Sequence, residues 1–433
     1  MNRLLVALIA VSCFTHSSYA DLKEYVQKKD AAFQWKLVRT VEAESGTAYT
    51  IDLVSQKWQG IVWDHTLVVV MPKGSKPGDT IFLWNDGGKP SSISSLVTFE
   101  LARRSKVPMA FLYGIPKQPL FEGKREDHLI AETFVRYLQS KDESWPLLFP
   151  MVKSLVRAMD CLEEFSKKEW KTDVKSFVVA GASKRGWTAW LTGAIDSRVK
   201  AISPMVIDTL NFQKQLPHQM KSYGKPSDMI APYTLRGLVP IPNTPIAEKL
   251  WQMIDPWVYR KDLEMPKLIV NGCNDPYWTQ DALNLYWDDL KGDKWVLYVP
   301  NAGHGLEETL PDGSKSRIKA ISTVAAYAYV QANKKSFPKL SWEHATKGDQ
   351  LTVKVASTTK PIGARLWYAD SATRDFRKSQ WKSVECTDCT KEVSASVGKP
   401  STGFRCLFLE SDYNIDEHPL HLSTQLRIVG TEK

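Results

Sequence analysis

The sequence lacks several features that would place the chain in a familiar class at once. Beyond its N-terminus, no apolar run approaches the ~20 residues that a membrane-spanning helix needs. It has no basic run, nucleic-acid-binding motif, internal repeat or low-complexity tract. No His-x-x-x-His motif occurs, and the histidines are scattered along the chain. These absences argue against an integral membrane protein, a nucleic-acid-binding protein, a repeat protein and a metalloenzyme, and we expect neither metal nor cofactor.

Cysteine is also scarce, with six in 433 residues, which excludes a disulfide-dense miniprotein. Cys386 and Cys389 have Cys-x-x-Cys spacing, and Cys406 follows them. A thioredoxin-like redox site would need a βαβ context, and a zinc site would need a fourth ligand. Neither is evident, so we favour a structural disulfide between Cys406 and one of the pair, although the sequence leaves the pairing open.

What the sequence does contain is an ordinary globular composition with two unusual features. The chain is 43% hydrophobic and 24% charged, which is ample for a packed core, and its length allows two or three domains. Lys and Arg number 57 against 48 Asp and Glu, a formal charge of +9, and there are 16 tryptophans. These two features suit an anionic or ring-shaped ligand, but also simple solubility and core packing.

The first residues have the three parts of a secretory signal peptide, predicted over 1–20. A short positive start precedes an apolar run at 4–13, and small residues at 18 and 20 suit a signal peptidase. We therefore expect a secreted or periplasmic protein. A lipoprotein modified at Cys13 is the less favoured alternative, because Ala10 stands where a larger aliphatic residue is preferred.

Apolar runs bounded by turn residues alternate with segments of helical periodicity, which predicts a mostly parallel sheet covered by helices. We assign this α/β domain to residues 21–336, with an N-terminal extension at 21–60 and an insertion or lid at 208–262. Short alternating segments over 338–433 predict a C-terminal β-sandwich of the immunoglobulin-like kind. The strands predicted in the α/β domain are 66–71, 80–84, 108–113, 176–180, 201–206, 267–271 and 294–299.

The most informative segment is 176–190, SFVVAGASKRGWTAW. A β-branched strand runs through Gly181 and Ala182 into Ser183, and a helix follows at once. A serine on such a turn is lifted clear of the sheet, with the positive end of the helix pointing at it. Because a serine hydroxyl is a weak nucleophile, catalysis would need a base and an orienting carboxylate.

Both partners follow later predicted strands. Asp275 lies in the loop after 267–271, and His304 lies just past 294–299. The order Ser183, Asp275, His304 is the order that α/β-hydrolases use, and the three strand ends meet at one sheet edge. We therefore predict these residues as the catalytic triad. Asp208, after the strand that follows the nucleophile helix, and Asp255 are rival acids.

An oxyanion hole is also required, because the tetrahedral intermediate carries negative charge. One donor should be the backbone N–H of Lys184, and the second should come from Gly87 or Gly88, which follow an early strand. The usual elbow is G-x-S-x-G, whereas here Arg185 occupies the position of the second glycine and Gly186 comes one later. Either the helix packs differently or the chain belongs to a distinct subclass.

Charged and aromatic side chains near the predicted triad are candidate substrate contacts. Arg185 adjoins the nucleophile and could bind a substrate carboxylate. Trp187 follows the elbow, and Trp278 follows the predicted acid. We predict Arg185, Trp187 and Trp278 as substrate-binding residues.

These segments resemble the PhoPQ-activated pathogenicity-related protein family over nearly the whole chain after the signal peptide. The matching stretches include 84–88 (WNDGG), 181–187 (GASKRGW), 301–304 (NAGH) and 374–377 (RDFR). The resemblance implies an exported α/β-hydrolase-like protein with a C-terminal immunoglobulin-like domain. The basic residue after the serine is also similar to the elbow of glucuronoyl esterases, G-C-S-R-x-G, where it is associated with the oxyanion site.

The leading hypothesis is an exported serine hydrolase that cleaves a carboxylic ester, with an amide as the less favoured substrate bond. The substrate would be a small molecule, a glycan or a peptide. The protein would have a role in virulence or in the envelope. One alternative is a non-catalytic binding or signalling protein on a hydrolase scaffold. Another is an aminopeptidase-like serine peptidase, which would share the triad. The sequence leaves the substrate, the oligomeric state and the motion of 208–262 open.

Overall fold

The computed structural model describes residues 22–310 and 312–431, without the side chains of residues 92–96. The signal peptide expected at 1–20, with Cys13, lies outside these residues. In the part of the chain that is described, no helix is both long enough and apolar enough to cross a bilayer.

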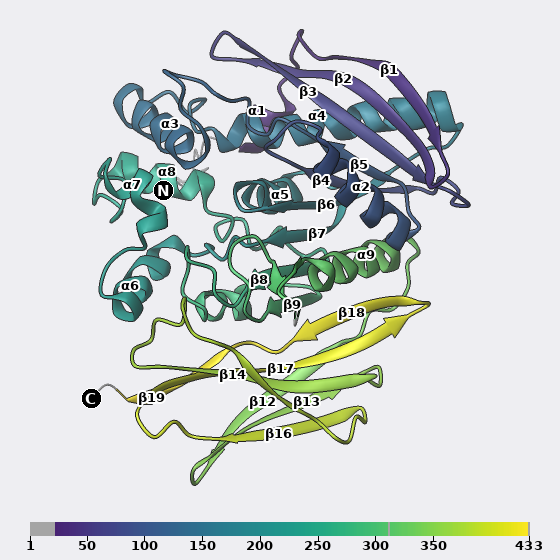
Figure 1. Cartoon of the computed structure of the whole chain (residues 1–433). Helices are drawn as coiled ribbons and strands as arrows, with labels where there is room; N and C mark the ends of the chain where they lie inside the picture. The colour runs from purple at the N-terminus through teal and green to yellow at the C-terminus, as the bar shows by residue number, and fades with distance from the viewer. Residues whose placement is uncertain (1–21, 311, 432–433) are drawn as a thin grey trace, which may run out of the picture.

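A single twisted sheet runs through the molecule, and its first nine strands form the α/β part in the order β1-β2-β3-β5-β4-β6-β7-β8-β9 (Figure 1). The first three strands and β5 pair antiparallel, and the pairs from β5 through β9 are parallel. The strands are β1 (Gln34–Ala43), β2 (Gly46–Trp58), β3 (Ile61–Pro72), β4 (Thr80–Asn85), β5 (Met109–Leu112), β6 (Ser176–Ala182), β7 (Val199–Met205), β8 (Lys267–Gly272) and β9 (Lys294–Val299).

The expected N-terminal extension at 21–60 differs from its prediction. Residues 34–58 form β1 and β2, which are the first two strands of the central sheet and not an appendage to it. Most of β1 is exposed, so its sequence carries little of the apolar pattern that marks a buried strand. Only α1 (Leu22–Gln27) packs as a separate element, through Leu22 and Val26.

Helices cover both faces of the sheet because the parallel strands are apolar on both sides. On β4, Ile81 and Leu83 pack into one core with α3, α4 and α5, whereas Phe82 packs into a second core with α2 and α9. The helices are α2 (Ser92–Ser105), α3 (Glu126–Ser140), α4 (Leu148–Phe165), α5 (Lys184–Ile195), α6 (Phe212–Tyr223), α7 (Ala231–Thr234), α8 (Pro245–Ile254) and α9 (Ile318–Ala332). A short hairpin, β10 (Glu308–Thr309) and β11 (Lys315–Ser316), precedes α9.

The C-terminal part consists of two facing sheets. Side chains from β13 and β16 meet side chains from β14 and β17 in a core of their own. The second sheet is not separate, because β18 pairs with β9 through Ser423 and Val296 and so extends the central sheet (Figure 1). The strands are β12 (Leu340–Lys347), β13 (Gln350–Ser357), β14 (Gly363–Ser371), β15 (Lys382–Glu385), β16 (Glu392–Gly398), β17 (Gly403–Ile415), β18 (His418–Ser423) and β19 (Arg427–Thr431).

The disulfide favoured from the sequence is not formed. All five cysteines of the described residues are free. Successive side chains of a strand point to opposite faces, and on β17 Cys406 points toward the α/β part while Leu407 points between the two C-terminal sheets. Cys386 and Cys389 pack on the side of Leu407. The strand itself therefore separates Cys406 from both proposed partners.

Candidate active site

Ser183 occupies a strained turn between β6 and α5. Its backbone has φ 58° and ψ −128°, a conformation that non-glycine residues rarely adopt, and α5 begins at the next residue, Lys184. Such strain is characteristic of a nucleophile held on a sharp strand-to-helix turn. The predicted elbow is therefore present, with the hydroxyl at the carboxyl end of a central strand.

The position of the glycines explains the departure from G-x-S-x-G. A Cβ added to Gly181 would lie 2.5 Å from Asn85 Nδ2, and one added to Gly186 would lie 2.7 Å from Ile207 Cγ2. Both are too close for a side chain. Gly186 therefore provides the close approach to the β7 side of the sheet, and position 185 is free to carry the long side chain of Arg185.

The three residues predicted as a triad lie in one hydrogen-bonded line. Ser183 Oγ is 2.9 Å from His304 Nε2, and His304 Nδ1 is 2.7 Å from Asp275 Oδ2. The other carboxylate oxygen, Asp275 Oδ1, accepts the backbone N–H of Tyr277 at 2.9 Å. The Tyr277 ring packs against the imidazole with 4.3 Å between ring centroids. The imidazole is thus positioned by a carboxylate on one side and an aromatic ring on its face.

Neither rival acid contacts His304. Asp208 accepts hydrogen bonds from the Tyr286 hydroxyl and from Asn271 Nδ2, and burial raises its pKa to about 7. Asp255 accepts the backbone N–H groups of Phe212 and Trp257, both at 2.9 Å, and burial raises its pKa to about 6. These two carboxyl groups hold parts of the segment 208–262 and neighbouring loops in place.

A second serine–histidine pair lies elsewhere and lacks an acid. Ser55 Oγ is 2.9 Å from His65 Nε2, but His65 Nδ1 faces the carbonyl oxygen of Tyr113 at 3.2 Å. Burial lowers the pKa of His65 to about 4. A histidine that resists protonation and has no carboxylate partner is poorly suited to accept a proton from a serine.

The predicted oxyanion donors are only partly available. The Lys184 N–H belongs to the first residue of α5, where no intrahelical acceptor exists. The Gly88 N–H donates to Asp86 Oδ1 at 2.7 Å, so Gly88 is committed to a local turn. The Gly87 amide has no hydrogen-bond partner among the described residues. The backbone N–H groups of Gly87 and Lys184 are therefore the two predicted donors that remain available.

The structure gives the Arg185 guanidinium partners within the protein. It donates to both carboxylate oxygens of Glu126 at 2.7 Å and to the carbonyl oxygen of Ile115. A Cβ on Gly87 would lie 1.7 Å from this guanidinium, so the loop that carries Gly87 packs directly against Arg185. Burial alone would raise the pKa of Glu126, but Arg185 and Lys184 outweigh it and lower the pKa to about 2.

Lys184 is also engaged through its side chain. Its ammonium group lies 3.0 Å from Asp127 and 3.2 Å from Glu126. Asp127 in turn accepts the Tyr233 hydroxyl at 3.0 Å and the Tyr277 hydroxyl at 3.4 Å. This partly buried cluster links the elbow, helix α3, the segment 208–262 and the aromatic ring on His304. Sequence analysis missed Tyr277 and Asp127 as site residues, and only the position of Tyr277 two residues after the predicted acid signalled it.

Three spaces adjoin Ser183 and His304. A cavity of about 40 Å³ lies beneath the segment 208–262, and its lining includes Trp187, Trp278, Ser183 and His304. An apolar pocket of about 510 Å³ reaches His304 on the other side. The third is an open recess of about 450 Å³ that contains Ser183 and Gly87.

The open recess adjoins a groove of about 1110 Å³ along β1, β2 and β3. Gly87, Gly88, Gln118 and Arg125 line both spaces. In the described part of the chain, Arg125 has no acidic partner within ion-pair distance. An extended substrate could therefore run from Ser183 past a free guanidinium into the groove.

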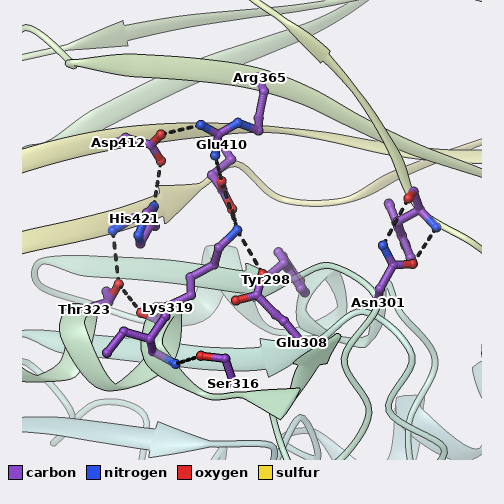
Figure 2. Close-up of polar contacts among 12 residues, drawn as sticks. Tyr298, Asn301, Glu308, Ser316, Lys319, Thr323, Arg365, Glu410, Asp412 and His421 are labelled. Atoms are coloured by element: carbon purple, nitrogen blue, oxygen red, sulfur yellow. Dashed lines mark hydrogen bonds and ion pairs between the residues drawn. The ribbon is translucent and has the colours of Figure 1, made fainter. Parts of the chain in front are cut away.

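One group of possible metal ligands occurs among the described residues, away from Ser183. Glu410, Asp412 and His421 bring one ligand atom each within 4.8 Å of one another. Arg365 and Lys319 already bind the Glu410 carboxylate, at 2.6 and 3.1 Å (Figure 2). Two cations thus compensate the acidic charge of this group, which joins the C-terminal sheets to α9.

The chain is similar in sequence to a described family and to a known protein. The model of the family described as PhoPQ-activated pathogenicity-related protein matches residues 22–377. Autocrine proliferation repressor protein A of Dictyostelium discoideum is 29% identical, and the alignment covers 99% of this chain and 94% of that protein.

Similar solved structures include esterases. Acetyl xylan esterase 1 from Thermoanaerobacterium sp. JW/SL YS485 has a TM-score of 0.48 and 12% identity, over 68% of this chain and 88% of that one. The glucuronoyl esterase from Solibacter usitatus has a TM-score of 0.41 and 11% identity, over 64% and 78%. The strand order, the elbow after β6 and the loops after β8 and β9 are those of the α/β-hydrolase fold, as predicted.

Proposed function

Because this chain belongs to the PhoPQ-activated pathogenicity-related protein family and holds Ser183, His304 and Asp275 in one hydrogen-bonded line, we propose that it is a serine hydrolase that cleaves carboxylic esters. The observation that carries the proposal is this line of contacts at 2.9 and 2.7 Å. It supplies a nucleophile, a base and an orienting acid within hydrogen-bond reach, the arrangement that activates a serine.

The reaction follows from these contacts. His304 Nε2 accepts the proton of Ser183 as Oγ attacks the ester carbonyl carbon. The N–H groups of Lys184 and Gly87 stabilise the resulting oxyanion. The intermediate collapses, the C–O bond to the alcohol breaks, and His304 returns the proton to the leaving alkoxide. Water, deprotonated by His304, then attacks the acyl-serine and releases the carboxylic acid and free Ser183.

The charges beside the serine favour ester hydrolysis over an aminopeptidase-like reaction. An aminopeptidase needs a carboxylate that is free to bind the ammonium group of a peptide N-terminus. Glu126 and Asp127, the acidic pair nearest the elbow, are already bound by Arg185 and Lys184. They are therefore committed to holding the site together.

The test compares hydrolysis of an ester panel and a peptide panel by the wild type, Ser183→Ala and Ser55→Ala. Ser55 is a matched control, because it also contacts a histidine but lies outside the proposed site. We expect ester hydrolysis that Ser183→Ala abolishes and Ser55→Ala retains. Peptide hydrolysis without ester hydrolysis, or full activity of Ser183→Ala, would contradict the proposal.

A second candidate function is signalling, which the name of the 29% identical relative, a proliferation repressor, favours. A signalling role that uses the scaffold alone would not depend on the nucleophile. In a proliferation assay with added protein, equal repression by wild type and Ser183→Ala would favour this role, and loss of repression in Ser183→Ala would tie any such effect to hydrolysis.

We also propose that the protein is exported, on the basis of residues 1–20. The N-terminal sequence of protein recovered from the periplasm or medium should begin at Asp21, as the predicted cleavage site implies. Full-length protein retained in the cytoplasm would refute export.

For the C-terminal part, we propose an immunoglobulin-like sandwich. The sheet β12-β13-β16 and the facing set β15-β14-β17 match the A-B-E and C′-C-F arrangement of that fold. An experimental structure with a different strand order would overturn this assignment.

A further inference from the structure

The loop between β14 and β15, residues 372–381, contacts the loop that carries Asp275. Asn274 immediately precedes Asp275, and its side-chain Nδ2 donates to three backbone carbonyl oxygens of that loop. The acceptors are Phe376 at 3.2 Å, Arg377 at 3.3 Å and Ser379 at 2.8 Å. The position of the acid loop is thus tied to the C-terminal part of the chain.

The same β14–β15 loop contacts the loop that carries His304. Asn301 Oδ1 accepts the backbone N–H of Trp381 at 2.8 Å, and Asn301 Nδ2 donates to the Trp381 carbonyl oxygen at 3.1 Å. Figure 2 shows these paired contacts of Asn301 at the edge of the C-terminal sheets. Asn301 has φ 56°, a left-handed conformation that asparagine tolerates well.

The β14–β15 loop is itself rigidly anchored. Phe376 is 0% exposed and Trp381 is 2% exposed, and the Trp381 ring packs edge-on against Phe408 of β17. The loop also reaches the lid, because the Arg377 guanidinium lies 3.9 Å from the centroid of the Tyr223 ring at the end of α6. Because the β14–β15 loop is anchored, it fixes the positions of the two loops that it contacts.

Not every contact across this interface involves a loop that carries a triad residue. Asn284 Nδ2 donates to the Leu426 carbonyl oxygen at 2.9 Å, which is the same kind of asparagine-to-backbone contact. Asn284 lies in the short turn Ala282–Leu285, which carries no triad residue. A substitution of Asn284 is therefore a control, because it weakens the contact between the two parts without touching a loop that carries a triad residue.

We propose that Asn274 and Asn301 are positioning residues, through which the C-terminal part holds Asp275 and His304 in register with Ser183. The inference rests on the proposed function. It gives the C-terminal sheets a role in the reaction without contact to the substrate. Catalytic geometry tolerates displacements of only about 0.5 Å, and a 1 Å misplacement can cost about 100-fold in rate.

The experiment measures kcat and KM for an ester that the wild type hydrolyses, together with the unfolding temperature, in Asn274→Ala, Asn301→Gly and Asn284→Ala. Glycine at 301 keeps the left-handed backbone and removes only the side chain. We expect kcat to fall by about 10- to 100-fold in the first two variants with KM nearly unchanged. Asn284→Ala should lower the unfolding temperature and leave kcat unchanged.

A spectroscopic signature separates positioning from stability. The Nδ1 proton of His304, held by Asp275, should give a low-field proton resonance in the folded wild type. This resonance should shift or broaden in Asn274→Ala and Asn301→Gly and stay in place in Asn284→Ala. Asn301→Asp keeps the acceptor for the Trp381 N–H, so it should recover part of the lost kcat and provides a milder variant if the others fail to fold.

The outcomes distinguish this inference from the proposed function. If Ser183→Ala abolishes activity but Asn274→Ala and Asn301→Gly match Asn284→Ala in kcat and in the His304 resonance, the positioning role is wrong and the proposed function stands. If Ser183→Ala keeps the activity of the wild type, the proposed function fails, and the positioning role fails with it.

Discussion

Replacing Arg185 by methionine should impair catalysis and acid-dependent stability together, because one guanidinium supports both the oxyanion loop and Glu126. Its bonds to Glu126 are both 2.7 Å, and it fills the space where a Gly87 side chain would be. Without it, the Gly87 amide loses its support. Loss of one oxyanion donor costs about 100- to 1000-fold in kcat, and we expect a decrease in this range.

The stability effect can be estimated from Glu126. Burial raises the pKa of Glu126, but Arg185, with smaller effects of Gln118 and Lys184, brings it from 4.5 down to about 2, and each pH unit corresponds to ~1.36 kcal/mol. That would be about 3 kcal/mol, but 40% of the Glu126 side chain is exposed, so solvent screening reduces it to about 1–2 kcal/mol. Because the folded pKa is the lower one, this stability is present above pH 4.5 and is lost as the pH falls toward 2.

The assay is a pair of measurements on the wild type, Arg185→Met and Arg185→Lys. Steady-state ester hydrolysis gives kcat, and chemical unfolding at a series of pH values gives the stability. Lysine keeps the charge but cannot bind both carboxylate oxygens in a fixed plane, so it should restore part of the stability and little of kcat. If Arg185→Met retains kcat within about threefold, where a lost donor should cost ~100-fold, the oxyanion loop does not depend on Arg185.

Four further predictions concern separate features. Asp208→Asn should leave kcat unchanged. Because the pKa of Asp208 in the folded protein, about 7, exceeds its ordinary value of 3.8, the stability of the wild type should fall as the pH rises from about 4 to 7. The stability of the variant should lack this pH dependence. Gly181→Ala should lower activity and the unfolding temperature, since its Cβ would lie 2.5 Å from Asn85 Nδ2; normal values in both would contradict the packing. Tyr277→Leu should lower kcat by about tenfold or more by removing the ring against His304, and an unchanged kcat would refute that role. Arg125→Ala should raise KM for esters that bear a carboxylate and not for neutral analogues, and equal changes for both would argue against the groove as an anion site.

The triad could be predicted because each of its residues follows a strand that is apolar on both faces. Strands of this kind can be recognised in a sequence as continuous apolar runs. Their carboxyl ends meet at one sheet edge regardless of how the helices pack. Ser183, Asp275 and His304 therefore converged as expected. Asp208 also follows such a strand, and only the hydrogen bond to Tyr286 shows that it points elsewhere.

Other features depend on contacts that no local pattern encodes. Strand β1 is mostly exposed, so its sequence resembles that of a surface segment. Cys406 alternates away from Cys386 because of the register of β17, which spacing along the chain does not reveal. The turn in which the Gly88 N–H donates to Asp86 is an exception among these features. This contact is local, and the Asp-Gly-Gly sequence indicates such a turn. The partner of Asn274 lies 105 residues away along the chain and that of Asn301 lies 80 residues away, so these contacts follow only from the packing of the two parts.

The most direct test of the central claim is covalent labelling of Ser183. A fluorophosphonate probe reacts with serines activated by a neighbouring histidine, and peptide mapping by mass spectrometry locates the adduct. The account predicts one adduct, on the peptide that contains Ser183, which is absent in Ser183→Ala and reduced in His304→Ala. An adduct on another serine that persists in Ser183→Ala, or no adduct on folded wild-type protein, would contradict it.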